Sequence, residues 1–162
     1  MIAALREALE AARDVAAPDW LLCAGAIRDA VWDTLHGREP GPPRDIDVAF
    51  FGADEGEVLA ALRARAPHIP WDARDQARVH TWYPERFGVA VEPFTCTADA
   101  IATFPETASC VGLRLDANDA LHPVAPFGLD DLLGLVCRHN ATRVPRDFYE
   151  RRVAEKGWAG RW

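Results

Sequence analysis

The sequence predicts a single domain of the α/β (α+β) class, in which a mixed sheet is flanked by helices. The chain has 162 residues, of which 49% are hydrophobic, so one core can form without disulfides or a structural metal. Segments with helical spacing of apolar residues alternate with segments in which apolar and polar residues alternate. No internal repeat and no linker rich in Gly or Ser divides the chain. We therefore assign residues 1–162 to one domain, with its core over residues 20–95 and a C-terminal hairpin and helices over residues 96–162.

The first half of the chain predicts a helix followed by two strand–helix pairs. Apolar residues at helical spacing, ended by a proline or a glycine, indicate helices over residues 2–15, 26–36 and 55–66. A short apolar run and an alternating run indicate strands over residues 20–24 and 44–51. The segment that holds three prolines and a glycine, residues 38–44, is predicted to be a loop.

The second half predicts further strands, a short helix, a hairpin and a last helix. Alternation indicates strands over residues 71–82 and 89–94, and a short helix follows over residues 98–103. Two apolar runs that bracket a turn of Asp and Asn residues predict a hairpin of residues 110–115 and 121–124. Helical spacing predicts a helix over residues 128–137, whose inward face carries Leu129, Leu132, Leu133 and Val136.

The charge distribution disfavours nucleic acid as a general partner. The formal net charge is −7, whereas affinity for nucleic acid depends mainly on cationic side chains that meet phosphates. Residues 137–162 differ from the rest, because they carry seven basic and three acidic side chains. This tail can hold a phosphate or RNA, but we favour a solvated helix end or a clamp onto the acidic body.

The remaining composition indicates a cytoplasmic protein with no membrane partner. No stretch approaches the roughly 20 apolar residues that a membrane span requires. The first ten residues include Arg6, Glu7 and Glu10, so they do not form an apolar signal segment. The four cysteines contain no CxxC pair, and such cysteines are typical of buried, reduced thiols.

The strand over residues 44–51 carries the first candidate site. Residues two apart on a strand share a face, so Asp45 and Asp47 lie together opposite the apolar residues Ile46, Val48 and Phe50. Neighbouring carboxylates repel unless a cation or a proton lies between them. A hard divalent ion such as Mg²⁺ suits these oxygen ligands, although a half-exposed strand with acidic outward positions explains the same pattern.

The turn from the first strand into the following helix carries the second candidate. Gly25 has no Cβ, so a phosphate can approach the backbone closely there. The amino end of a helix favours an anion, and Arg28 in the first turn adds a fork of donors for a triphosphate. A plain turn glycine, with Arg28 solvated or stacked on Trp32, is the alternative.

Taken together, the two motifs resemble the head of the DNA polymerase β-type nucleotidyltransferases. Ala-Gly-Ala-Ile-Arg-Asp over residues 24–29 and Asp-Ile-Asp over residues 45–47 parallel the Gly-Gly-x-Val-Arg-Asp and Asp-x-Asp of tRNA CCA-adding enzymes and bacterial poly(A) polymerases. Ala24 departs from the first glycine of that pattern. Nearly the whole chain also resembles a family of small stand-alone bacterial nucleotidyltransferase-like proteins, through residues 24–28, 31–32, 45–47, 75–83, 99–101, 111–115 and 125–132.

In this superfamily a third carboxylate on a neighbouring strand often completes the metal site. The alternation over residues 71–82 places Asp75 among apolar residues and Asp72 on the polar face with Arg74 and Arg78. Members of the smaller family usually have Asn at the position of Asp75. We therefore expect Asp72 to be the third ligand, while an edge strand with a solvated outer face explains the pattern equally well.

The resemblance implies a Mg²⁺-dependent transferase that moves a nucleoside monophosphate from an NTP to an acceptor hydroxyl and releases pyrophosphate. Asp45 and Asp47 would bind two Mg²⁺ ions, and Asp72 would assist one of them. Gly25 and the helix after it would hold the β- and γ-phosphates, while Arg28 would neutralise charge on the leaving group.

The expected partners are an NTP and a small-molecule or protein acceptor. CCA addition is disfavoured, because we expect no further helical domains to grip tRNA and the chain is acidic. The alternative is a non-catalytic nucleotide- or metal-binding module that acts as an interaction partner. A cleft that the C-terminal tail fills would favour the module, and carboxylates that converge on an open cleft would favour the enzyme.

Overall fold

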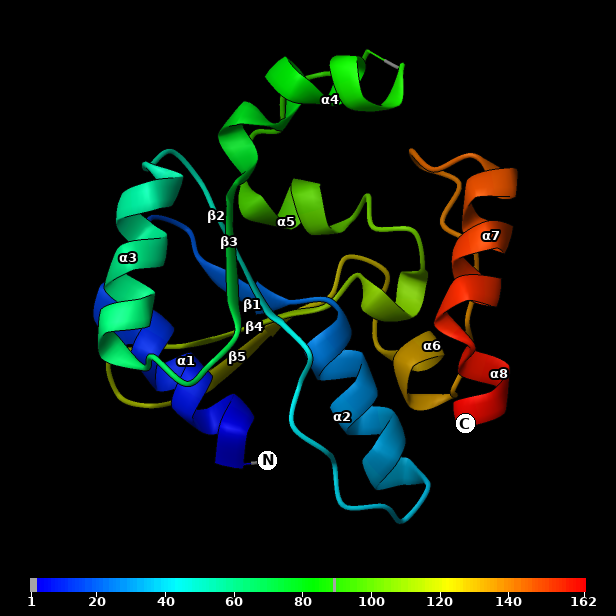
Figure 1. Ribbon diagram of the computed structural model, residues 1–162, viewed down its shortest axis with the longest axis horizontal. Helices are drawn as coiled ribbons and strands as arrows, with labels where there is room; N and C mark the ends of the chain where they lie inside the picture. Colours follow the sequence, from blue (N-terminus) through cyan, green and yellow to red (C-terminus); the bar gives the residue numbers. More distant parts are fainter. Residues whose placement is uncertain (1–2, 89) are drawn as a thin grey trace.

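The computed structural model describes residues 3–88 and 90–162 and contains a five-stranded mixed sheet (Figure 1). The strands follow the order β3-β2-β1-β4-β5 across the sheet. They span Leu21–Cys23 (β1), Ile46–Phe50 (β2), Trp71–Asp75 (β3), Gly112–Leu115 (β4) and Leu121–Val124 (β5). β2 and β3 run parallel, and the other neighbouring pairs run antiparallel. The mixed sheet and the hairpin expected from the sequence are therefore confirmed.

Helices lie on both faces of this sheet. The longer ones are α1 (Ala3–Val15), α2 (Gly25–Leu35), α3 (Glu55–Arg65), α4 (Val79–Phe87) and α7 (Arg146–Lys156). The shorter ones are α5 (Thr97–Ile101), α6 (Asp130–Leu133) and α8 (Trp158–Arg161). Within the described part of the chain, none of these helices has the length and apolar character needed to cross a membrane.

The two faces of β2 separate the main core from the acidic residues. On one face, helices α1, α2 and α3 pack against the alternate residues Ile46, Val48 and Phe50. On the other face, a smaller cluster joins Ile101 of α5 to Ala49. Asp47 projects to the same face as Ala49, because side chains alternate along a strand. The larger core therefore anchors β2, while its opposite face remains available for polar side chains.

The predicted strand over residues 71–82 is wrong beyond Asp75. Residues 76–78 form a 3₁₀ turn and α4 follows at once. Asp75 is buried, and its Oδ1 accepts hydrogen bonds from the backbone nitrogens of Gly52 (2.8 Å) and Ala77 (3.0 Å). This side chain caps the turn and ends the ladder, so the alternation of apolar residues continues in the sequence but not in the sheet.

Two other predicted elements are shorter than expected or absent. Residues 90–94 have no regular structure where a strand over 89–94 was expected, and residue 89 lies outside the described residues. The helix expected over residues 128–137 is limited to α6. It ends because Leu135 adopts a left-handed conformation with φ 58°. Leu132 is buried as expected, whereas Leu133 and Val136 are exposed.

A glycine at the start of β4 tests how tightly the sheet packs against α5. A Cβ on Gly112 would lie 2.9 Å from Leu21 Cδ1 and 3.3 Å from Ile101 Cδ1, and both neighbours are fully buried. We expect Gly112→Ala to lower the free energy of unfolding by about 1–3 kcal/mol, because a closely packed core resists added volume. Gly41→Ala, which meets no atom within 4 Å, is the control. Equal unfolding free energies for the two variants in urea would contradict this packing.

Candidate functional site

The predicted acidic pair lies at the start of β2. Asp45 immediately precedes the strand and is exposed, whereas Asp47 lies within it and is half-buried. In the sheet, Asp47 is opposite Cys23 of β1 and beside Asp72 of β3. Paired residues of neighbouring strands project to the same face. The structure therefore brings Asp72 beside the pair, although the strand prediction that selected it was too long.

The surroundings of Asp47 disfavour the ionised form of its side chain. Burial, together with the charges of Asp45 and Asp72, raises the pKa of Asp47 to about 6. Arg152 and Lys156 have the opposite, weaker effect on this pKa. A carboxylate in such surroundings is stabilised when a cation binds next to it. This is the electrostatic character expected of a cation ligand.

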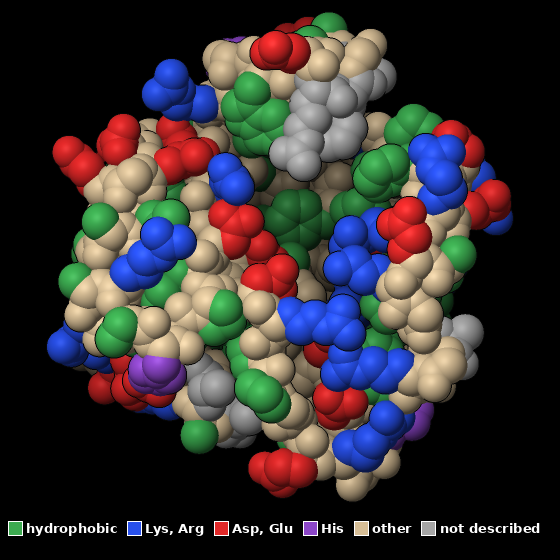
Figure 2. Space-filling model, viewed as in Figure 1, with side chains coloured by type: hydrophobic (Ala, Val, Ile, Leu, Met, Phe, Trp, Pro, Cys, Tyr) green, Lys and Arg blue, Asp and Glu red, His purple; other side chains and the backbone are tan. Residues whose placement is uncertain are grey.

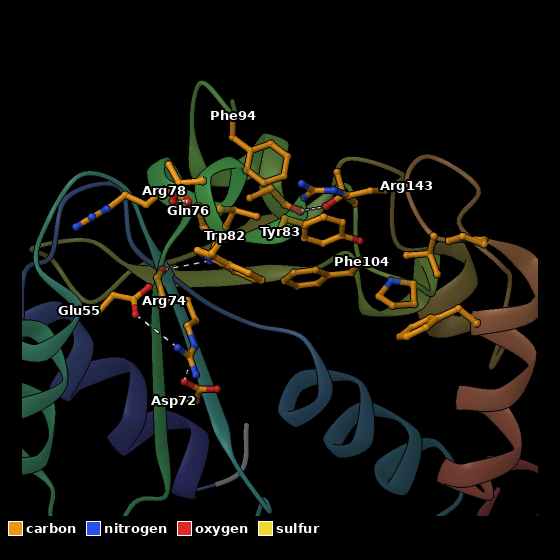
Figure 3. Close-up of a pocket in the computed structure, with 18 of the residues that line it drawn as sticks. Glu55, Asp72, Arg74, Gln76, Arg78, Trp82, Tyr83, Phe94, Phe104 and Arg143 are labelled. Atoms are coloured by element: carbon orange, nitrogen blue, oxygen red, sulfur yellow. Dashed lines mark hydrogen bonds and ion pairs between the residues drawn. The ribbon is translucent and has the colours of Figure 1, made fainter. Parts of the chain in front are cut away.

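Asp72 is directed partly towards a neighbouring arginine. Its Oδ1 lies 3.1 Å from Arg74 Nε, and Arg74 Nη1 lies 3.5 Å from Glu55 Oε2 (Figure 3). Both Asp72 and Arg74 keep roughly half of their side-chain surface exposed, so this ion pair is weak. The charge of Asp72 is therefore partly balanced by Arg74.

The donor set fits a hard divalent cation. Carboxylate oxygens are the ligands that Mg²⁺ prefers, and Asp47 of β2 supplies them together with Asp45, whose charge acts on it. Within the described residues, no group of three or more His, Cys, Asp or Glu side chains is arranged as a metal site.

The turn between β1 and α2 has an unusual backbone. Ala24 adopts φ 63° and ψ −131°, a region that glycine populates far more readily than other residues. Gly25 begins α2, and a Cβ there would lie 3.7 Å from Arg28 Nη2. The turn therefore keeps a glycine-like shape although alanine occupies its first position.

Arg28 is buried under the C-terminal helices rather than solvated. Its Nη2 donates to Asp29 Oδ1 at 2.6 Å and its Nη1 to Ser109 Oγ at 2.8 Å. Its guanidinium lies 4.3 Å from the ring centroid of Trp158 and 5.6 Å from that of Trp32. The donors that were expected to meet a triphosphate are therefore directed to Asp29 and Ser109, while the guanidinium stacks on Trp158 and, more distantly, on Trp32.

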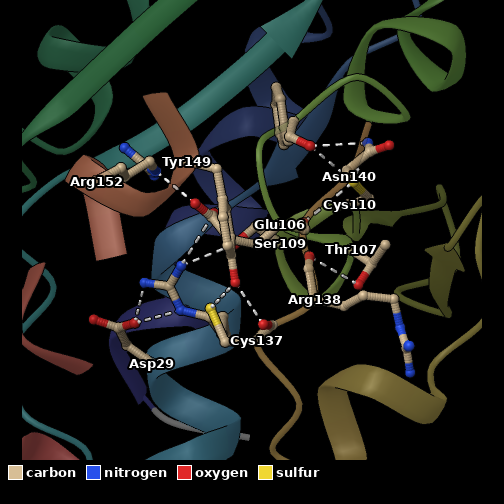
Figure 4. Close-up of polar contacts among 12 residues, drawn as sticks. Asp29, Glu106, Thr107, Ser109, Cys110, Cys137, Arg138, Asn140, Tyr149 and Arg152 are labelled. Atoms are coloured by element: carbon tan, nitrogen blue, oxygen red, sulfur yellow. Dashed lines mark hydrogen bonds and ion pairs between the residues drawn. The ribbon is translucent and has the colours of Figure 1, made fainter. Parts of the chain in front are cut away.

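A buried carboxylate joins this region to α7. Glu106 is fully buried and accepts a hydrogen bond from Arg152 Nε at 2.6 Å and from Ser109 Oγ at 3.1 Å. Arg28 Nη1 lies 3.8 Å from Glu106 Oε2, the oxygen that accepts from Ser109. The contacts of Glu106 with Arg152 and Ser109 are drawn in Figure 4. One acidic side chain thus connects the first turn of α2 with the middle of α7.

The last residues of the chain fasten α8 to α2. Arg161 Nη1 lies 3.0 Å from Asp29 Oδ2, and Arg161 Nη2 lies 3.1 Å from Asp33 Oδ2. The indole nitrogen of Trp162 donates to Asp33 Oδ1 at 2.8 Å. The expected clamp of the basic tail onto the acidic body is therefore confirmed for this part of the tail.

A cavity of about 490 Å³ lies between the aspartates and the tail. The predicted residues Gly25, Arg28, Asp45 and Asp47 line it. Cationic side chains that the sequence did not single out complete the wall, namely Arg44, Arg152, Lys156 and Arg161. Figure 2 shows acidic and basic side chains gathered on opposite sides of a hollow. The basic excess of residues 137–162 was the only sequence signal for this wall, and it did not indicate which side chains face the aspartates.

The cysteines are consistent with the sequence interpretation. Cys23 and Cys110 are buried and Cys96 and Cys137 are half-buried, all four as free thiols. Burial raises the pKa of the Cys110 thiol to about 12 and also raises the pKa of Cys23. Protonated thiols are poor nucleophiles, so the chemistry of the site falls to the carboxylates and cations.

Comparisons with known proteins agree with this geometry. A family model described as Nucleotidyltransferase matches residues 10–162. A solved NMR structure described as revealing a CCA-adding enzyme head domain superposes with a TM-score of 0.81 and 26% sequence identity. The similarity covers 99% of this chain and 87% of that one. No curated protein sequence matches the chain.

The conformation of Ala24 predicts a stabilising substitution. We expect Ala24→Gly to raise the free energy of unfolding by about 1 kcal/mol, because glycine relieves the strain of a positive φ at this turn. Ala30→Gly, within α2, should instead lower it by about 1 kcal/mol through lost helix propensity. Thermal or urea unfolding of both variants checks the signs. A loss of stability in Ala24→Gly would show that the turn is unstrained.

The Glu106 network predicts a strongly destabilising substitution. We expect Glu106→Gln to lower the free energy of unfolding by about 3 kcal/mol, since it removes the counter-charge of Arg152 from a fully buried position. Glu150→Gln removes an exposed pair with Arg146 and should cost less than about 0.5 kcal/mol. Chemical denaturation of the two variants measures the difference. Similar losses would mean that Glu106 does not hold the tail in place.

Proposed function

Because the chain belongs to the nucleotidyltransferase family, we propose that it transfers a nucleoside monophosphate from an NTP to an acceptor hydroxyl. The bond from the acceptor oxygen to the α-phosphorus forms, the bond to the bridging oxygen breaks, and pyrophosphate and the hydroxyl proton leave. The observation that carries the proposal is the cavity in which Asp45 and Asp47 face a wall of cationic side chains. An acidic pair opposite a cationic wall suits a metal-bound polyphosphate.

We assign the β- and γ-phosphates to the cavity between α2 and the tail. Gly25 leaves room at the amino end of α2, where backbone N–H groups and the helix dipole favour an anion. Arg152 and Lys156 extend from α7 into the same cavity. Arg28 adds charge to its wall while its own fork is held by Asp29 and Ser109. These cations would stabilise the charge that builds on the leaving pyrophosphate.

We assign divalent cations to Asp45 and Asp47, with Asp72 as the third carboxylate. Two bound Mg²⁺ ions would neutralise the triphosphate and make the acceptor hydroxyl more acidic. The raised pKa of Asp47 supports this assignment, because its burial beside Asp45 and Asp72 is unfavourable without a cation. Arg74 balances Asp72 in the protein alone. Release of this weak pair would free Asp72 for the site.

The open cavity favours an enzyme over a non-catalytic module. The C-terminal helices form one wall of the cavity, and the space of about 490 Å³ between that wall and the aspartates remains open. Acceptor access is supported by a smaller cavity of about 250 Å³ that also reaches Asp47 and is lined by Asp72 and Arg152. A module that only binds nucleotides does not need a second cavity through which another molecule can reach Asp47.

The Mg²⁺-dependent binding of NTPs tests the proposal. We expect an NTP with Mg²⁺ to raise the free energy of unfolding of the wild-type protein, by about 2.7 kcal/mol at 100 times Kd. Asp47→Asn should lose this Mg²⁺-dependent gain and all pyrophosphate release. Its own unfolding free energy should not fall, because the change removes a charge that burial opposes. Thermal shift with the four NTPs, with and without Mg²⁺, measures both quantities.

Asp14→Asn is the matched control, because Asp14 lies on α1 and pairs with Arg13 and Arg65 away from the cavity. It should keep the NTP-dependent shift. The proposal fails if the wild-type protein shows no shift with any NTP and Mg²⁺. It also fails if Asp47→Asn retains the wild-type response.

A further inference from the structure

A larger cavity adjoins Asp72 and shares no lining residue with the cavity of the cationic wall. It has a volume of about 1150 Å³ and is lined by Asp72 and Arg74 of β3. The smaller cavity that reaches Asp47 shares both of these residues with it. The cleft therefore runs from the cationic wall, past Asp47 and Asp72, into this larger cavity. In-line transfer requires the acceptor to approach opposite to the leaving pyrophosphate, which places the acceptor on the side of the larger cavity.

Aromatic rings form much of the wall of the larger cavity. They come from α4, the segment before α5, the segment after α5 and α7, and they are Trp82, Tyr83, Phe94, Phe104 and Phe148 (Figure 3). Trp82 keeps 36% of its surface exposed, although a tryptophan is a large apolar side chain. Cavities that bury small molecules are lined mainly by apolar and aromatic side chains with a few polar groups. Rings on several sides favour a flat, apolar part of a ligand.

Among the described residues, Arg143 is a partly buried cation of this wall with no ion-pair partner. The guanidinium of Arg143 lies 4.0 Å from the ring centroid of Tyr83 and 4.8 Å from that of Phe94. Its Nε and Nη2 atoms are buried and have no hydrogen-bond partner among the described residues. By contrast, Arg151 in the same wall is paired with Asp147 at 2.9 Å. Buried guanidinium donors without a partner are costly, and a carboxylate or phosphate satisfies them best.

We propose that this aromatic cavity, defined by Trp82, Phe94, Phe104 and Arg143, is the acceptor site, and that it takes a small molecule with a planar ring and an anionic group. The rings hold the planar part, Arg143 binds the carboxylate or phosphate, and a hydroxyl of the same molecule faces Asp72. The assignment of the cavity to the acceptor rests on the proposed nucleotidyl transfer. The binding of a ring with an anion does not, because it depends only on the cavity itself.

Calorimetric titration of the full-length chain with simple probes tests the binding, in the absence of NTP and Mg²⁺. Phenyl phosphate and benzoate carry both the ring and an anion, and comparison of the two shows which anion is preferred. Phenol carries only the ring, and inorganic phosphate carries only the anion. We expect at least one aromatic anion to bind about tenfold or more tightly than phenol and inorganic phosphate.

Substitutions locate the binding. Arg143→Gln should weaken the aromatic anion about tenfold and leave phenol unchanged, whereas Arg143→Lys should recover part of the loss. Phe104→Leu should weaken phenol and the aromatic anion alike. Arg146→Gln is the control, because Arg146 pairs with Glu150 on α7 and does not line the cavity. Circular dichroism and thermal unfolding confirm that each variant is folded.

The outcomes separate this inference from the proposed function. Asp47→Asn should bind the aromatic anion normally while it loses Mg²⁺-dependent NTP binding. Arg143→Gln should keep Mg²⁺-dependent NTP binding while its binding of the aromatic anion is weakened. The inference is overturned if no aromatic anion binds at millimolar concentration. It is also overturned if Arg143→Gln binds the probe as the wild type does, or if inorganic phosphate alone binds as tightly. If the wild-type protein binds the aromatic anion but no NTP, only the proposed transfer reaction and the assignment of this cavity to the acceptor are overturned.

Discussion

The buried carboxylate of Glu106 is the contact on which the shape of the site depends. It accepts a short hydrogen bond from Arg152 of α7 and one from Ser109, and it lies near Arg28 of α2. These three partners come from segments far apart in the sequence. Because an unpaired buried charge is strongly unfavourable, none of the three segments can move away without a large cost. The cationic wall is thereby held at a fixed separation from the aspartates.

The site places carboxylates opposite cationic side chains, and each group of like charges would be unfavourable without the other. Asp47 is half-buried beside two other carboxylates, and its raised pKa records that cost. Arg152 and Lys156 reduce the cost from across the cavity. The core beneath β2, with Ile46, Val48 and Phe50 fully buried, supplies the stability that lets the opposite face remain charged. A stable core beneath a locally unfavourable charged face is typical of functional sites.

Sequence reasoning succeeded where a short pattern determines a local structure. The alternation around Asp45 and Asp47 identified β2 and its acidic face, and Gly25 marked the turn into α2. It failed after Asp75, because a side chain that caps a turn ended a strand whose alternation continued. It also missed the ends of α6, where Leu135 adopts a positive φ that its residue type does not suggest.

The sequence could least predict which side chains distant in the chain come together in the folded protein. Alternation placed Asp72 on the same face of the sheet as Asp47, even though the strand of Asp72 is shorter than expected. Arg152 and Lys156 lie about a hundred residues from Asp47 in the sequence, and no local pattern relates them to it. Likewise, the rings that line the larger cavity with Arg143 come from four segments. Contacts of this kind depend on the packing of α7 against the body, which sequence periodicity does not reveal.

Lys156 gives the molecule an unusual chemical property. It is the only lysine in the sequence, and it is exposed on the wall of the cationic cavity. Apart from the amino terminus, its ε-amine is therefore the only primary amine in the chain. Acylating or reductively alkylating reagents would modify the protein at the rim of that cavity and at almost no other place. A fluorophore attached in this way would report directly on whether the cavity is occupied.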